Sequence, residues 1–304
     1  MKNIILASLL VTTSVFAQNK VIYGDDNRVD VFESTNSAFV ELSKSTAAMI
    51  AGSSLKTVKG EVEISGSTLQ ARGICAKERF SKQISAANCS GFLVSENIMV
   101  TAGHCIKDAA DCASYKWVFD YKVDAADQGK VTVQSSSVYS CTKILARKLD
   151  NFGKDDYAMF EIDRKVTDRR PLSFRKTGKV AKGDAIVVIG HPTGLPTKVS
   201  AAGKVTRNTE ASRFSTTLDT FHGNSGSAVF DAKTGLVEGI LIQGKNDYMP
   251  SKKDDPKSCL IVNKCDDNGN NCSAGQESGP IQWGEVVLRI ESVAKIINAN
   301  LKAK

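Results

Sequence analysis

The stretch Cys89-Ser-Gly-Phe-Leu-Val-Ser-Glu-Asn-Ile-Met-Val-Thr-Ala-Gly-His104-Cys105 carries the pattern on which the fold prediction depends. Within it, residues 91–94 and 98–101 form two short apolar runs, separated by the polar residues Ser-Glu-Asn. Short apolar runs bounded by turn residues are typical of β-strands. The stretch therefore predicts two neighbouring strands, the second of which leads into a histidine flanked by small residues.

The same pattern continues along the chain. Further strand-like runs are rich in β-branched and aromatic residues, and Asp231-Ala-Lys-Thr-Gly235 is typical of a hairpin connection. This spacing predicts an all-β sandwich or barrel. Helical periodicity is present near 36–50 and is stronger at 283–301, which predicts a C-terminal α-helix packed on the body. The remaining predicted strands are 115–123, 157–162, 185–189, 198–205, 214–218, 228–230 and 236–242.

The composition and charge are those of a globular protein. The chain has 304 residues, of which 41% are hydrophobic and 24% charged, which excludes collagen-like and disordered classes. The net charge of +7 is concentrated in residues 164–182, which hold eight basic side chains and one acidic one. Because Phe174 is the only aromatic residue among them, this segment is better explained as a solvated linker than as a nucleic-acid site. We therefore expect no nucleic-acid partner.

The amino end has the features of a secretory signal. Lys2 precedes an apolar run over 4–16, which ends at Val15-Phe16-Ala17 with small residues at the positions that signal peptidases inspect. The run is too short to span a bilayer, and no later segment approaches the required length. We expect a signal peptide over 1–17, a secreted or periplasmic protein, and no membrane partner.

Eight cysteines in an exported chain predict disulfides. Their number alone does not determine how they pair. The alternative, a zinc site, is disfavoured because the chain has no CxxC pair and only three histidines. We therefore expect no metal and no cofactor.

Three separated sequence islands contain residues suited to acyl transfer. They centre on His104, on Asp156 and on Ser225, and each alone also fits a structural role in a strand end or turn. Together they supply what a serine hydroxyl needs to act as a nucleophile: an imidazole base and a carboxylate that orients it. Glycine beside the serine allows the chain to bend so that backbone amides can face an oxyanion.

The islands resemble those of chymotrypsin-fold serine endopeptidases, particularly the bacterial trypsin-like and glutamyl-endopeptidase branch. The similarity lies in Thr101-Ala-Gly-His104-Cys105, in the Asp-aromatic-Ala sequence at Asp156, and in Gly223-Asn-Ser225-Gly-Ser, in the family's order. It covers roughly residues 85–245. The resemblance implies two antiparallel six-stranded β-barrels with the site between them. It also implies a Cys89–Cys105 disulfide, because a cysteine stands sixteen residues before Cys105.

The resemblance also implies the role of each site residue. Ser225 would be the nucleophile, His104 the general base and acid, and Asp156 the orienting carboxylate, with Asp155 as the alternative. The amides of Gly223 and Ser225 would form the oxyanion hole. The expected substrates are proteins or peptides, and the expected state is a monomer.

The domain organisation follows from these features. After the signal peptide we expect an N-terminal segment over 18–84, with 18–20 as a short propeptide. The first β-barrel would span 85–165, a basic linker 166–182, and the second barrel 183–283, including a cysteine-rich loop over 245–282. The C-terminal helix would occupy 284–304.

The propeptide hypothesis rests on the segment that follows Lys20. Val21-Ile-Tyr-Gly-Asp-Asp-Asn-Arg28 resembles the start of mature glutamyl endopeptidases, which suggests cleavage between Lys20 and Val21. Asn224 precedes the serine where vertebrate-type enzymes have an aspartate that pairs with a new amino terminus. An amide cannot form that ion pair, which puts such an activation switch in doubt here.

Residues near Ser225 in the sequence bear on primary specificity. Asp219 stands where trypsin-type enzymes place the carboxylate that binds Lys or Arg, which favours weakly a basic preference. A structural turn residue is the alternative for Asp219. Thr220 matches a hydroxyl of glutamyl endopeptidases, but Leu241 replaces their histidine. The expected substrate-binding residues are Asp219, Thr220, His222, Leu241, Gln243 and Gly244. A non-catalytic binding module on the same fold is the alternative function.

Overall fold

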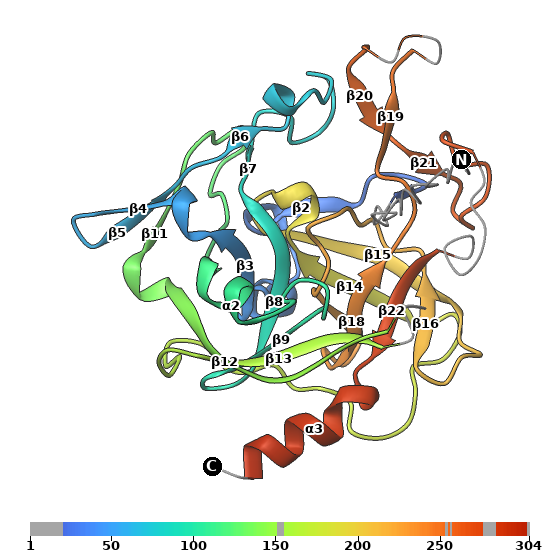
Figure 1. Ribbon diagram of the computed structural model, residues 1–304. Helices are drawn as coiled ribbons and strands as arrows, with labels where there is room; N and C mark the ends of the chain where they lie inside the picture. The colour runs from blue at the N-terminus through green and yellow to red at the C-terminus, as the bar shows by residue number, and fades with distance from the viewer. Residues whose placement is uncertain (1–20, 151–154, 253–254, 256, 276–283, 303–304) are drawn as a thin grey trace, which may run out of the picture.

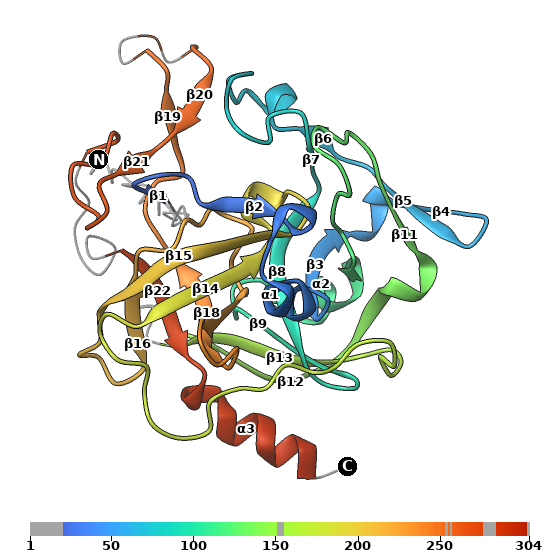
Figure 2. The same ribbon diagram turned by 180° about the vertical axis from the view of Figure 1, so that it is seen from behind.

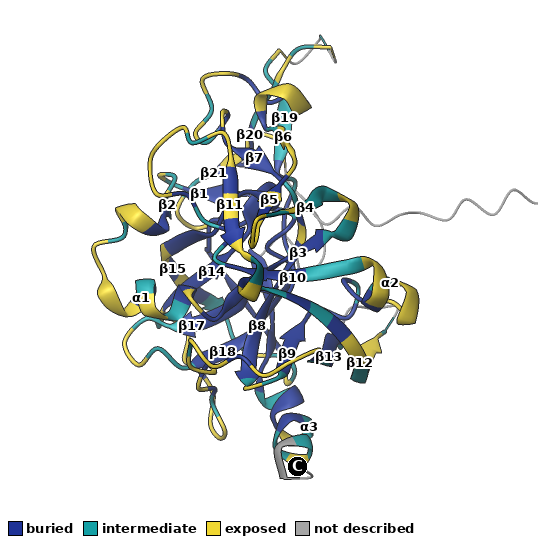
Figure 3. Ribbon diagram, turned by 90° about the vertical axis from the view of Figure 1, so that its left-hand side faces the viewer, coloured by how far each residue is buried: buried dark blue, intermediate teal, exposed yellow. Residues whose placement is uncertain are grey.

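The computed structural model describes residues 21–150, 155–252, 255, 257–275 and 284–302, and it consists mainly of β-strands (Figure 1). The predicted signal peptide, 1–17, and residues 18–20 lie outside the described residues. Figures 1 and 2 show two groups of strands side by side, with α3 below them. Figure 3 shows that the buried residues follow the strands, whereas α2 and many loops are largely exposed and α1 is partly buried.

The first barrel is closed and six-stranded, with the order β10-β12-β13-β9-β8-β3 and antiparallel pairing throughout. Its closing pair joins β3 to β10. Strand β3 lies in the segment expected to precede this barrel. The helical pattern near 36–50 is wrong over its second part, because pairing with the distant strands β8 and β10 makes those residues a strand. The barrel strands are β3 (Thr46–Ala51), β8 (Ala87–Ser95), β9 (Ile98–Thr101), β10 (Tyr115–Phe119), β12 (Val138–Leu149) and β13 (Asp156–Ile162).

The second barrel is also six-stranded and antiparallel, with the order β14-β17-β18-β22-β16-β15. Pairing of β14 with β15 closes it, and β2 (Arg28–Asp30) adds to β15 as a seventh strand of the sheet. These two barrels confirm the predicted fold class. The barrel strands are β14 (Ala185–Gly190), β15 (Lys198–Arg207), β16 (Arg213–Thr216), β17 (Ala228–Asp231), β18 (Val237–Gln243) and β22 (Glu285–Arg289).

Short strands lie outside the barrels. They form a three-stranded sheet of order β11-β5-β4 and the two-stranded sheets β1–β21, β6–β7 and β19–β20. Four of them, β4 to β7, lie in the long connection between β3 and β8. The peripheral strands are β1 (Ile22–Tyr23), β4 (Leu55–Val58), β5 (Glu61–Ile64), β6 (Ser67–Thr68), β7 (Ile84–Ser85), β11 (Val131–Gln134), β19 (Tyr248–Pro250), β20 (Leu260–Val262) and β21 (Lys264–Cys265).

Within the described part of the chain the three α-helices are short, and their bounds correct the sequence analysis. They are α1 (Ser37–Ser43), α2 (Ala109–Ser114) and α3 (Glu291–Lys302). The C-terminal helix was expected from residue 284, but residues 285–289 form β22. Every residue of β22 is buried. A strand that is buried on both faces does not alternate between apolar and polar residues. The apolar residues of β22 therefore also fit the helical periodicity of the segment that follows.

The basic segment between the barrels is docked at a few points, while most of its basic side chains are exposed to solvent. Its apolar residues Leu172 and Phe174 are buried, and the Leu172 amide donates to Leu93 O of the first barrel at 2.8 Å. The Arg175 amide donates to Val237 O of the second barrel at 3.0 Å, and its guanidinium pairs with Glu238 at 2.6 Å. The segment therefore fastens the two barrels together.

The cysteines form four disulfides, Cys75–Cys259, Cys89–Cys105, Cys112–Cys141 and Cys265–Cys272. The first joins the connection between β3 and β8 of one barrel to the β19–β20 hairpin that extends from the other. Backbone bonds lie beside it, from the Cys75 amide to Leu260 O and from the Leu260 amide to Gly73 O. This disulfide is thus a covalent link between insertions of the two barrels.

Loss of this link is expected to destabilise the protein strongly. It closes a loop of 184 residues, whereas Cys265–Cys272 closes one of 7. In the chain-entropy model, replacing the first pair by alanine lowers the free energy of unfolding by about 5 kcal/mol, and replacing the second by about 2 kcal/mol. Urea unfolding of the two double variants measures the difference, and equal losses would contradict this expectation.

Among the described residues, no helix combines the length and apolar character needed to cross a bilayer.

Candidate active site

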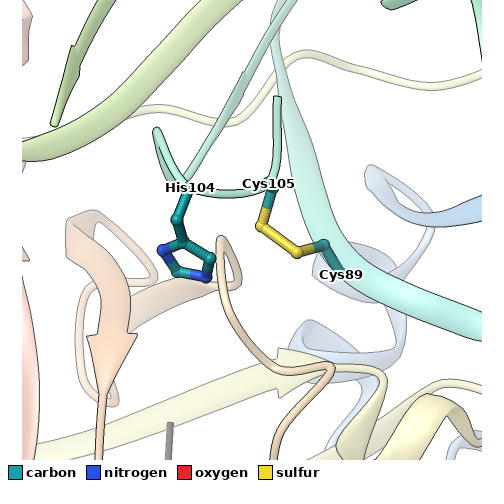
Figure 4. A group of neighbouring side chains, drawn as sticks. All are labelled: Cys89, His104 and Cys105. Carbon is teal, nitrogen blue, oxygen red and sulfur yellow. A yellow bond between two sulfur atoms is a disulfide. The ribbon is translucent and has the colours of Figure 1, made fainter. Parts of the chain in front are cut away.

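His104 lies in the turn that follows β9. The Cys105 amide donates to Ala102 O, and the guanidinium of Arg147 donates to the carbonyl oxygens of Gly103 at 2.9 Å and Ile106 at 2.7 Å. The turn is also fixed by the Cys89–Cys105 disulfide, as the resemblance implied, and Figure 4 shows the imidazole beside this disulfide. Because both sulfur atoms are in the disulfide, they offer no thiolate to a metal.

Asp156 is the first residue of β13 and binds His104 at two points. Its Oδ1 accepts the His104 backbone amide at 2.9 Å, and its Oδ2 lies 2.7 Å from His104 Nδ1. The carboxylate is buried, whereas the imidazole is 18% exposed. A carboxylate at Nδ1 holds the proton on that nitrogen, which leaves Nε2 as the proton acceptor.

Asp155, the alternative carboxylate, lies on the other side of the chain. Successive side chains of an extended chain point in opposite directions. The Asp155 carboxylate accordingly accepts from Lys148 Nζ at 2.5 Å. Of the two candidates, Asp156 is the one that contacts His104.

The Ser225 loop lies directly on β8 and β9 of the first barrel. Gly226 has a φ of +87°, and a Cβ at this position would lie 2.2 Å from Ser90 O and from Thr101 Oγ1. The Ser225 carbonyl oxygen accepts the Ser90 amide at 2.8 Å and lies 3.6 Å from Cys105 Sγ, in the residue that follows His104. The structure therefore brings the Ser225 loop and the His104–Asp156 pair, which come from different barrels, into one site.

Ser90 is a site residue that the sequence analysis did not single out. Its hydroxyl donates to Gly223 O at 2.8 Å and accepts the His191 amide at 3.0 Å. Ser90 thus connects β8 to two loops near Ser225, that of Gly223 and that of His191. A buried serine in a strand carries no distinctive sequence pattern, and its place beside Cys89 in the first island is the only signal that could have marked it.

These positions agree with a known family. The sequence profile of the trypsin-like peptidase domain matches residues 89–240, half of the chain, and includes all three islands. The chain belongs to the trypsin-like peptidase family. No curated protein matches it in sequence.

Solved structures of low sequence identity share the fold of this trypsin-like peptidase. A Glu endopeptidase in complex with MPD has 16% identity and a TM-score of 0.53, and the match covers 93% of this chain and 100% of that one. Vibrio cholerae VesB protease has 13% identity and a TM-score of 0.51, with coverage of 93% and 68%. The scabies mite inactivated protease paralogue S-I1 has 13% identity and a TM-score of 0.52, with coverage of 92% and 100%.

Asp219, the expected specificity carboxylate of the trypsin-like peptidase, holds the N-terminal segment. Its Oδ1 accepts the amide of Tyr23 and its Oδ2 the amide of Asn27, both at 2.8 Å, and the residue is 2% exposed. Burial raises the pKa of Asp219 to about 6, although the two amide bonds oppose this shift. These contacts support the structural alternative for Asp219.

The raised pKa of Asp219 predicts a pH-dependent stability. Between about pH 4 and pH 6 the folded protein keeps a proton that the unfolded chain releases, so stability falls as the pH rises through this window. The variant Asp219→Asn lacks this titratable carboxyl group and keeps all the other titratable groups. Between pH 3.5 and 7 the free energy of unfolding of the wild type should therefore fall by about 3 kcal/mol relative to the variant. Urea unfolding at both pH values measures this, and parallel pH profiles would refute it.

Thr220 is fully buried beside a carboxylate that the sequence analysis missed. Its hydroxyl donates to Glu285 Oε2, and the Tyr23 hydroxyl donates to Glu285 Oε1 at 3.2 Å. Glu285 begins β22, which was expected to be helical. Because Glu285 was placed in a helix, the sequence did not indicate that its carboxylate contacts Thr220.

His222 forms a second histidine–aspartate pair, three residues before Ser225. Asp247 Oδ2 lies 2.6 Å from His222 Nδ1 and accepts the His222 amide at 3.1 Å. The imidazole is 44% exposed, so it is open to a bound substrate. His222 is thus an expected substrate-binding residue with an exposed side chain, and the sequence analysis did not identify Asp247 as its partner.

The three remaining expected substrate-binding residues belong to β18 or follow it. Leu241 is fully buried in the core of the second barrel, so its side chain is a packing residue. Its backbone contacts the Ser225 loop, since Leu241 O accepts the Gly226 amide at 2.8 Å. Gln243 ends β18 and is half-buried, and Gly244 follows it.

Proposed function

We propose that this trypsin-like peptidase is a serine endopeptidase that hydrolyses peptide bonds through an acyl-enzyme on Ser225. The observation that carries the proposal is the contact of the Asp156 carboxylate with His104 Nδ1 at 2.7 Å. This contact leaves Nε2 to accept a proton, and the neighbouring Ser225 loop supplies the hydroxyl.

The proposed reaction has two halves. The Ser225 Oγ attacks the substrate carbonyl carbon while its proton passes to His104 Nε2, and Asp156 stabilises the imidazolium. The amides of Gly223 and Ser225 stabilise the oxyanion. The C–N bond then breaks, and the leaving amine takes the proton from Nε2. In the second half, a water molecule attacks the acyl-enzyme with His104 again as the base, and the carboxylic acid is released from Ser225.

A preference for Lys or Arg has less support than the activity itself. It was expected from Asp219, but both oxygen atoms of that carboxylate are bonded to backbone amides. His222, held by Asp247, is proposed to contact the substrate, whereas Thr220 is fully buried and bonded to Glu285. We therefore propose endopeptidase activity on protein or peptide substrates, by a monomer, and leave the side-chain preference to the cleavage experiment below.

The alternative is a binding module that has lost catalysis. One of the structures that share the fold is an inactivated protease paralogue, so the fold alone does not imply hydrolysis. This chain keeps His104, Asp156 and Ser225, and the first two are bonded. A bonded histidine–aspartate pair favours the catalytic function over the binding module.

We further propose that the chain is exported and then cleaved. Four disulfides are consistent with an extracellular protein. Val21 is fully buried, and its carbonyl oxygen accepts the Thr220 amide at 3.3 Å. Amino-terminal sequencing of the secreted protein should give Val21, which follows Lys20. A start at Gln18 would refute the second cleavage.

The proposed function is tested with a fluorophosphonate probe and a mixed peptide library. The secreted wild type should be labelled at Ser225, as mapped by mass spectrometry, and should cleave internal peptide bonds. The library also reports which side chain precedes the cleaved bond. A folded wild type that is neither labelled nor active would favour the binding module.

A further inference from the structure

Thr193 has a backbone conformation that its side chain disfavours. It lies in the 3₁₀ turn Pro192–Gly194, between β14 and β15, with φ 52° and ψ 26°. A β-branched residue rarely adopts this left-handed conformation, because its side chain crowds the backbone. Such residues persist only where their surroundings hold them, and they cluster at functional sites.

Three elements hold Thr193 in place. Its amide donates to His222 O at 2.6 Å, and its carbonyl oxygen accepts from Ser85 Oγ of β7 at 2.6 Å. Its hydroxyl lies 2.7 Å from the hydroxyl of Tyr248 on β19. Thr193 is 3% exposed, so these bonds are shielded from water. The strained residue is therefore fixed by both barrel insertions and by the nucleophile loop.

The bond from Thr193 to His222 sets the orientation of the peptide unit before Gly223. In a trans peptide, the carbonyl and the N–H of the next residue point in opposite directions, and the described chain contains no cis peptide. With His222 O held towards Thr193, the Gly223 N–H points away from it. No described residue accepts a hydrogen bond from this amide.

The following peptide unit is fixed as well. Ser90 Oγ donates to Gly223 O at 2.8 Å. Gly223 has a φ of +88°, and a Cβ there would lie 2.5 Å from His191 O and 2.8 Å from Gly194 N. The loop that contains Thr193 therefore packs against Gly223 with no side chain between them. We therefore expect a change in the backbone at Thr193 to shift Gly223.

We propose that Thr193 is a positioning residue that holds the Gly223 amide in the orientation required for an oxyanion hole. The inference rests on the proposed function, because it assigns Thr193 a role in the same hydrolysis. Tyr248 and Ser85 act with Thr193, since they hold it in its strained conformation. A purely structural role for the turn is the alternative.

Thr193→Pro tests the proposal, because proline removes the amide and cannot adopt a φ of 52°. Loss of one oxyanion donor lowers kcat by about 10²–10³-fold, so we expect a fall of about 100-fold with KM changed by less than about 3-fold. A peptide aldehyde, whose adduct with a catalytic serine carries the oxyanion, should bind weaker by about the same factor as kcat falls. Thr193→Gly keeps the amide and relieves the strain, so its fall in kcat should be much smaller, about 5-fold.

The double variant Ser85→Ala/Tyr248→Phe covers the case in which Thr193→Pro does not fold. It removes two of the three bonds that hold Thr193 and keeps its amide, and we expect kcat to fall by about 10-fold with KM unchanged. The pH dependence of kcat/KM, which reports the histidine base, should not shift in any of these variants.

The outcomes separate the inference from the proposed function. An active wild type whose folded Thr193 variants keep kcat and aldehyde affinity would refute the inference alone. So would a loss of activity caused only by a higher KM. A wild type that neither hydrolyses peptides nor reacts with fluorophosphonate would refute both.

Discussion

Replacement of Ser225 by alanine is expected to lower kcat by about 10⁴-fold or more, the largest effect of any single substitution in this chain. Without the hydroxyl, no acyl-enzyme forms, and only the amides of the Ser225 loop remain to stabilise a direct attack by water. The residue is 2% exposed and its carbonyl bonds to Ser90, which alanine preserves. The protein should therefore fold normally, with the loss confined to kcat in steady-state assays.

A matched serine provides the control. Ser200 lies in β15 of the second barrel, is 3% exposed, and has a hydroxyl without a hydrogen-bond partner among the described residues. Ser200→Ala removes the same group from a comparable environment and should keep kcat within about 2-fold. Equal losses in both variants would indicate that Ser225 matters for packing rather than for chemistry.

Asp156→Asn is expected to have the second-largest effect, a fall in kcat of about 10³–10⁴-fold near neutral pH. An asparagine can present its NH₂ group to His104 Nδ1. That nitrogen then becomes the acceptor, so the proton moves to Nε2 and the base is lost. KM should change little, because Asp156 lies behind His104 and is buried.

Asp155→Asn is the control for the Asp156 variant. The Asp155 carboxylate pairs with Lys148, whose side chain is 55% exposed. Exposed ion pairs contribute little to stability. We expect kcat to stay within about 2-fold of the wild type. A large loss in Asp155→Asn, with little loss in Asp156→Asn, would reverse the assignment of the two carboxylates.

The fold could be predicted largely because strand formation leaves a local pattern. The predicted strand 91–94 lies within β8, and the predicted strand 98–101 coincides with β9. Both were found because apolar runs between turn residues mark strands directly. The prediction was wrong at β22, where burial on both faces removes the alternation. The region 36–50 was read as helical, but its second part forms β3, whose partners β8 and β10 are distant in sequence.

The site was predictable to the extent that its chemistry depends on side-chain type. His104, Asp156 and Ser225 stand in distinctive islands, and the structure brings the first two into contact. Ser90 and Thr193 act through backbone contacts and a strained conformation, which their residue types do not reveal. At Asp219 the sequence position predicts a substrate contact or a structural turn residue, and the bonds of its carboxylate to the N-terminal segment favour the second.

The most direct measurement of the central claim is rapid acid quenching of the enzyme during turnover of an activated ester, followed by mass spectrometry. We predict one acyl group per protein molecule, attached to the peptide that contains Ser225, and none in the Ser225→Ala variant. Turnover without an acyl adduct on Ser225, or an adduct that persists in the alanine variant, would contradict the proposed mechanism.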